Sequence, residues 1–141
     1  MRRAWAMAAA AALTCAKAPG DGPAPVTLDR DQCAGCGMLI SDPLFVAEVK
    51  DPRGHVAKFD DVGCAVAWLA RQPFADDARA VVWVASVADG GWLDARSARF
   101  LAGRTSPMGH GFAAVEGGDA GVDFSTMSAA VQAAPLVKGT R

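Results

Sequence analysis

The sequence predicts an α+β domain in which antiparallel hairpins pack against short helices. Two segments rich in β-branched and aromatic residues, 44–50 and 80–87, are typical of strands. Between them, residues 62–71 carry apolar side chains at helical spacing. A strand, a turn and a helix follow each other again in the second half, so we expect two related ββα(β) units, at about 31–88 and 92–135. The 141 residues are enough for one domain with a thin core.

The first 30 residues are expected to precede this domain. Residues 1–15 resemble a signal peptide, because Arg2 and Arg3 come before an apolar run that is too short to span a bilayer. The run ends at Cys15, which resembles a bacterial lipoprotein cysteine; an ordinary secretory signal is the alternative. Residues 16–30 are rich in proline and glycine and predict a flexible tether. We therefore expect an exported protein, lipid-anchored on the periplasmic face of the outer membrane or otherwise soluble in the periplasm.

The first hairpin is expected between residues 44–50 and a return strand at 55–59. The four residues between them, Asp51-Pro52-Arg53-Gly54, have proline second and glycine fourth, which favours a turn. Asp60 or Asp61 is then a good N-cap for the next helix. Both carboxylates are explained by capping, so an acid/base pair is not needed to account for them.

Helical spacing predicts the next element at 62–71, which Pro73 ends, before the buried strand at 80–87. The second half begins with Ala95, Ala98 and Leu101, which are spaced as in a helix. We therefore expect a helix at 94–101 that stops at Gly103, a strand at 111–116, a return strand at 122–124, and a helix at 126–134 capped by Ser125.

Sulfur chemistry is concentrated in Cys33-Ala-Gly-Cys36-Gly-Met38. Apart from Cys15, the chain has three cysteines, the third being Cys64. An odd number cannot pair completely within an exported chain, so at least one thiol is free, bound to metal or bonded to a partner. The glycines flanking Cys36 permit the tight turn that a shared metal ligand pair needs.

Four interpretations of the Cys-x-x-Cys pair remain open at this point. A redox pair is usually found in a thioredoxin-like βαβ context, which this order of elements does not provide. A zinc site would use Cys33, Cys36 and Cys64, with His55 or Asp61 as the fourth ligand. A plain disulfide is the third interpretation, and a Cu(I) site is the fourth.

Ligand softness favours Cu(I), because thiolate and thioether sulfur suit a soft monovalent ion. Met38 and Met108 lie beside glycine or proline in loops, and their thioethers would act as ligands only in a Cu(I) site. Met127 is instead expected in the core. His110 follows Met108 by two residues and is a further ligand candidate, or a surface residue. Cys64 is either a thiolate activated by the helix start or a buried apolar cysteine.

These motifs together resemble the NosL family, the accessory proteins of nitrous oxide reductase maturation. The resemblance covers about residues 31–134. Besides the Cys-x-x-Cys-Gly-Met motif, it rests on Phe59-Asp60-Asp61-x-Gly63-Cys64, on Trp92-x-Asp94-Ala95, and on Ser106-Pro107-Met108-Gly109 before Phe112-Ala113. It implies a metal-binding domain at 31–141, built from ββαβ units similar to a domain of alkylmercury lyase. Residues 33–70 also resemble the small metal-binding modules called TRASH and YHS.

The NosL resemblance implies a periplasmic, membrane-anchored copper chaperone. Its ligands would be Cys36 and Met108, with Met38 and His110 as local candidates, and its partner a copper-accepting protein or an assembly factor of that pathway. We expect ligand exchange without covalent catalysis; a zinc-binding structural or sensing domain is the main alternative, and a lyase or thiol oxidoreductase a third. The net charge of −1 and the scattered basic residues argue against nucleic acid as a partner.

Overall fold

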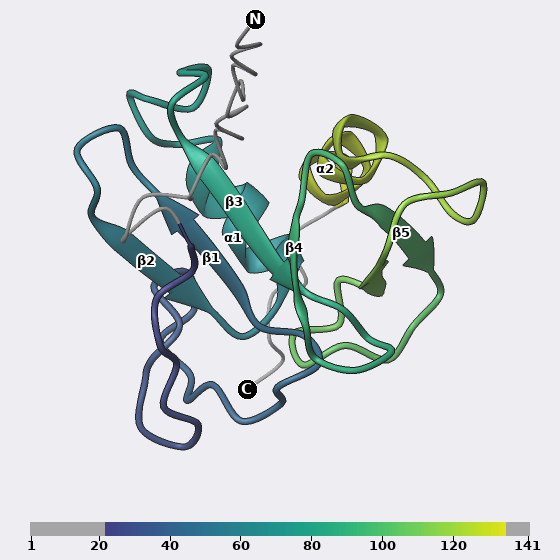
Figure 1. Ribbon diagram of the computed structural model, residues 1–141, viewed down its shortest axis with the longest axis horizontal. Coiled ribbons are helices and arrows are strands. Elements are labelled where there is room, and N and C mark those ends of the chain that lie inside the picture. The colour runs from purple at the N-terminus through teal and green to yellow at the C-terminus, as the bar shows by residue number, and fades with distance from the viewer. Residues whose placement is uncertain (1–21, 135–141) are drawn as a thin grey trace, which may run out of the picture.

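Antiparallel pairing builds the two sheets of this α+β fold, which confirms the predicted fold class. The computed structural model describes residues 22–134 (Figure 1). The larger sheet has the order β2-β1-β3-β4 and the smaller one pairs β5 with β6. The strands are β1 (Ala47–Lys50), β2 (Val56–Phe59), β3 (Val81–Ala85), β4 (Trp92–Asp94), β5 (Arg99–Ala102) and β6 (Phe112–Val115), and the helices are α1 (Val62–Leu69) and α2 (Phe124–Ala133).

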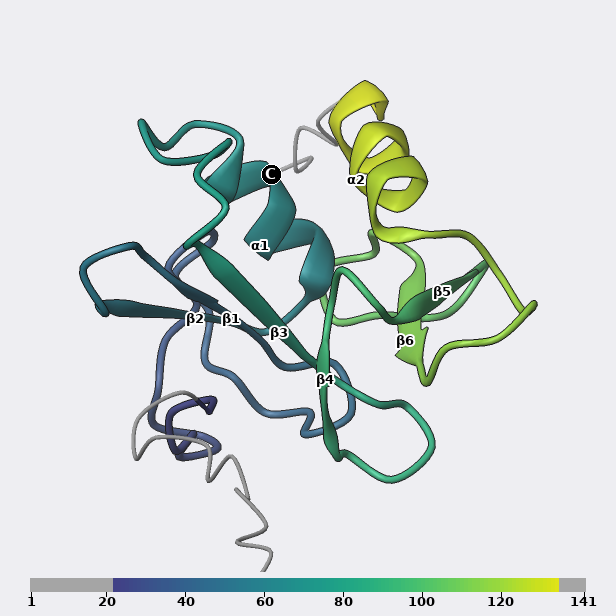
Figure 2. The same cartoon turned by 45° about the horizontal axis from the view of Figure 1, so that its top comes forward.

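The larger sheet is covered on both faces (Figure 2). Alternate residues of β1 point to opposite sides, as the strand repeat requires. Ala47 and Val49 join the main core with residues of α1 such as Val66. Val46 instead packs with Ile40 in a second, smaller cluster beneath the segment that precedes β1. The sheet therefore separates a helix layer from a layer of irregular chain.

Ala24 and Pro25, which belong to the segment expected as a tether, and Asp31, which follows it, contact this outer face. The Glu48 carboxylate accepts a hydrogen bond from the Ala24 amide at 2.8 Å. The Lys58 ammonium donates to the Pro25 carbonyl at 2.6 Å and pairs with Asp31 at 2.7 Å. The expected signal peptide, Cys15 and the start of the tether lie outside the described residues. Between residues 22 and 134, no helix combines the length and apolar character that crossing a bilayer requires.

The prediction of a helix at 94–101 is wrong. Asp94 accepts hydrogen bonds from the Arg96 amide at its side chain and from the Ala98 amide at its carbonyl, which gives a single turn between β4 and β5. Ala95 and Ala98 are buried because this turn packs into the core, and their spacing therefore mimicked a helix. Phe100 continues into β5, where it pairs with β6.

The hairpin expected between 111–116 and 122–124 does not form either. β6 pairs with β5, and Val122 makes an isolated bridge to Phe100 on the other edge of β5. The last helix also starts earlier than predicted: Asp123 is its N-cap and accepts from the Thr126 amide at 2.7 Å. Ser125 lies inside the first turn and donates to Asp123. An ionised carboxylate is the stronger acceptor and takes the cap.

The two halves meet through the end of β3 and through the helices. The Val87 amide donates to the Ala114 carbonyl at 2.8 Å, beside a parallel bridge between Ser86 and Ala114. α1 packs against α2, and Met127 of α2 is fully buried in the main core, as expected. This arrangement brings the loop before β6 to the start of α1.

Candidate metal centre

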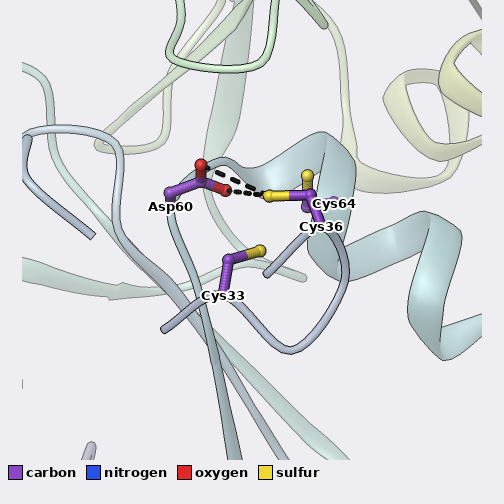
Figure 3. A group of neighbouring side chains, drawn as sticks. All are labelled: Cys33, Cys36, Asp60 and Cys64. Atoms are coloured by element: carbon purple, nitrogen blue, oxygen red, sulfur yellow. Dashed lines mark hydrogen bonds between the residues drawn. The ribbon is translucent and has the colours of Figure 1, made fainter. Parts of the chain in front are cut away.

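A tight turn presents the Cys-x-x-Cys pair. The Cys33 amide donates to the Met38 carbonyl, and the Gly37 amide donates back to the Cys33 carbonyl, both at 2.8 Å. Gly37 has a φ of +79°, a conformation that glycine adopts without strain. This closed turn directs the side chains of Cys33 and Cys36 to the same side (Figure 3).

The turn is attached to the end of β2 and to the start of α1. The Ala34 amide donates to the Lys58 carbonyl at 2.8 Å. A Cβ placed on Gly35 would lie 3.3 Å from the Cβ of Cys64, so the turn lies directly against α1. Glycine at this position therefore allows the Cys-x-x-Cys turn to approach the third cysteine.

Four side chains converge where β2 passes into α1 (Figure 3). The ligand atoms of Cys33, Cys36, Asp60 and Cys64 all lie within 4.8 Å of one another. The Cys36 thiol donates to the two Asp60 carboxylate oxygens at 3.7 and 3.6 Å. Cys33, Asp60 and Cys64 are buried, whereas Cys36 is exposed. Three sulfurs and one oxygen at this separation can bind a single metal ion.

The three cysteines are free thiols with unequal affinities for protons. A hydrogen bond with the Cys64 thiol lowers the pKa of Cys33 to about 4, and the same contact raises the pKa of Cys64. Burial raises the pKa of Cys36 to about 11 and that of Asp60 to about 6. At neutral pH the cluster therefore has one thiolate ready, and a metal that takes all three sulfurs must displace protons from Cys36 and Cys64.

Asp61 fixes a second loop beside the cluster. One of its oxygens caps α1 by accepting from the Gly63 amide at 2.7 Å. The other accepts from the Ser106 hydroxyl at 2.6 Å and from the Met108 amide at 3.2 Å. A fully buried carboxylate with three donors holds the loop at 106–110 firmly against the helix start.

His110 reaches the cluster from this loop, and Met108 lines the pocket beside it. The Cys64 sulfur and the His110 Nε2 are 3.7 Å apart. A pocket of about 310 Å³ is lined by Cys36 and Cys64 together with Met108 and His110. A Cβ on Gly63 would lie only 2.1 Å from the His110 Cγ, so the imidazole rests directly on the backbone of α1. The two sulfur-rich points of the sequence thus share one pocket.

The remaining candidate ligands lie elsewhere. Met38 is 56% exposed and is outside the described lining of this pocket. His55 is exposed in the β1–β2 turn, where its ring contacts Asp51 at 2.9 Å. The zinc interpretation expected His55 or Asp61 as the fourth ligand. The fourth member of the cluster is instead Asp60. The sequence did contain a signal for Asp60 as a ligand. One helix start needs one capping carboxylate, and the sequence supplies two, Asp60 and Asp61.

Comparison of the chain with models of known protein families finds no match, and comparison with curated protein sequences finds none either. The geometry of the cluster therefore carries the functional argument.

Proposed function

We propose that this protein binds Cu(I) at the Cys33–Cys36–Cys64 cluster and transfers it to a copper-accepting protein. The observation that carries the proposal is the convergence of three cysteine sulfurs, with Asp60, within 4.8 Å. Thiolates are the ligands that Cu(I) prefers, and it is stable with two or three of them.

The uneven burial of the cluster supports a carrier rather than a permanent site. Cys33 and Cys64 are buried and hold their positions, whereas Cys36 is exposed. A sulfur atom of the acceptor can therefore approach the ion from the side of Cys36. It then replaces the Cys36 sulfur as a ligand, through an intermediate in which both proteins bind the ion. Met108 and His110 line the adjoining pocket and offer uncharged, weaker ligands along that route. Transfer of this kind exchanges ligands and requires no covalent catalysis.

The resemblance to NosL supports nitrous oxide reductase maturation as the pathway. Export to the periplasm and a lipid anchor at Cys15 belong to the same proposal. An anchored carrier would act at a membrane surface, where an exported copper ion is received.

Anaerobic titration of the full chain with Cu(I), in competition with a chromophoric chelator, tests the proposal. We expect one equivalent to bind, and Cys33→Ser and Cys64→Ser each to weaken binding by at least about tenfold. Met38→Leu is the matched control, since it changes an exposed thioether that lies outside the cluster. Unchanged affinity in both Cys33→Ser and Cys64→Ser would refute the site.

A zinc-binding structural or sensing domain is the second candidate, and Asp60 is the observation that favours it. A carboxylate is a good zinc ligand and a poor one for Cu(I), and it brings the number of candidate ligands to the four that a structural zinc site uses. Asp60→Asn removes the anionic oxygen at nearly constant size. If zinc is the native ion, we expect this variant to lose zinc affinity by at least about tenfold. If copper is the native ion, the Cu(I) affinity of Asp60→Asn should stay within about threefold of the wild-type value. Metal analysis of the purified wild type should then find copper.

A further inference from the structure

We propose that the pocket beside the cluster binds a small anionic thiol, which brings the metal ion to the protein or completes its coordination. This inference deepens the proposed function and rests on it. It concerns the pocket of about 310 Å³ formed by α1, α2 and the loops that carry Cys36 and His110. Its size is at the lower end of the range for small-molecule sites.

Residues of α1 and of the turn after it line this pocket. Cys64 and Ala67 belong to the helix, and Arg71 lies in the turn that follows the C-cap Ala70. The pocket is therefore lined by a thiol and by a guanidinium.

Most of the other side chains that line the pocket are apolar. Phe112 of β6 and Val131 of α2 close the pocket from the side of the second half. Such walls suit the carbon body of a ligand and disfavour a free hydrated ion. The occupant should therefore be an organic molecule.

Charge in the pocket favours an anion. None of the described residues that line it is acidic, and the Arg71 guanidinium makes no hydrogen bond or ion pair with residues 22–134. An arginine with its donors unused is suited to a carboxylate, which it can bind with two hydrogen bonds. We therefore assign the carboxylate end of the ligand to Arg71.

The sulfur end of the ligand follows from the cysteines. Cys36 and Cys64 belong to the cluster and also line the pocket, so an ion in the cluster is accessible to a donor atom from this side. A thiolate sulfur is the donor that a soft ion prefers. In the exchange, the bond between the metal and the ligand sulfur breaks as a bond to a cysteine sulfur forms. The cysteine proton passes to the departing thiolate, and no electron is transferred.

Two matched probes test the assignment: 4-(mercaptomethyl)benzoate and its neutral amide, which share the ring and the thiol. The affinity of each is measured anaerobically on the Cu(I)-loaded full chain. We expect the carboxylate to bind about fivefold more tightly than the amide, since an exposed charge-assisted contact is modest. Arg71→Gln should abolish this preference. Arg53→Gln, which changes an exposed arginine outside the pocket, should retain it.

The outcomes of this experiment separate the anionic thiol site from the proposed function. Equal binding of the two probes to the wild type, or an unchanged preference in Arg71→Gln, refutes the anionic thiol site. In both cases Cu(I) binding without a probe would still support the proposed function. If the chain binds no Cu(I) in the absence of either probe, the proposed function fails and this inference fails with it.

Discussion

The contact between Gly63 and His110 makes Gly63→Ala a sharp test of how the two halves pack. Gly63 lies in the first turn of α1, and a Cβ there would lie 2.1 Å from the His110 Cγ and 2.4 Å from its Cβ. Ordinary carbon contacts are about 3.5–4.0 Å, so the imidazole must move by more than about 1 Å. That movement changes the position of His110 relative to Cys64.

Two effects of opposite sign compete in this variant. Alanine is a better helix former than glycine by up to about 1 kcal/mol, less at a helix end. Forcing a side chain into a packed region costs about 1–3 kcal/mol. We therefore expect a net loss of about 1–2 kcal/mol in the free energy of unfolding, measured by urea denaturation of the metal-free protein.

A double-mutant cycle isolates the contact. His110→Gly removes the three atoms that lie nearest to the new methyl group, all of which belong to the His110 side chain. In that background Gly63→Ala should be neutral or stabilising, because only the helix propensity remains. If Gly63→Ala stabilises the protein in both backgrounds, the packing of His110 on α1 described above is wrong.

Three further variants test other parts of the structure by the same unfolding assay. Asp61→Ala removes the acceptor of three hydrogen bonds and should cost about 3 kcal/mol, against about 1 kcal/mol for Ser106→Ala; equal losses would contradict the clamp. Gly121→Ala should cost at least about 2 kcal/mol more than Gly103→Ala, since both have positive φ but only Gly121 has the Phe100 carbonyl oxygen 2.2 Å from the new Cβ; similar losses would count against this contact. Burial raises the pKa of Glu48, so the folded state binds this proton more tightly than the unfolded state, and the contribution of Glu48 to stability should fall as pH rises above about 4.5. The stability of Glu48→Gln relative to the wild type should therefore increase between pH 4 and pH 8, and a constant difference would argue against a buried, ionisable Glu48.

Local signals in the sequence were sufficient for the first half of the fold. A proline-glycine turn between two β-rich segments predicted the β1–β2 hairpin, and a carboxylate before an apolar helical pattern predicted the start of α1. These elements are specified by neighbours in the chain, so their physical causes are visible in the sequence. The spacing of Cys33 and Cys36 likewise indicated a shared ligand role, because a turn of four residues is enough to bring the two sulfurs together.

The second half depended on contacts that are distant in sequence. The apolar residues of 94–101 are spaced as in a helix. β5 forms instead because Phe100 pairs with β6 on one side and with Val122 on the other. An apolar residue at every third position indicates burial, but this spacing does not distinguish a helix from a buried turn followed by a strand.

The candidate site shows the same division. The sequence alone identified the three cysteines and the two loops that supply Met108 and His110. Only the tertiary structure decided that Asp60 completes the cluster, that Asp61 clamps the second loop, and that Met38 and His55 lie apart from the cluster. The reason is physical: two adjacent carboxylates are equivalent as residues, and the path of the chain from β2 into α1 directs one toward the three cysteines and the other toward two backbone amides and the Ser106 hydroxyl.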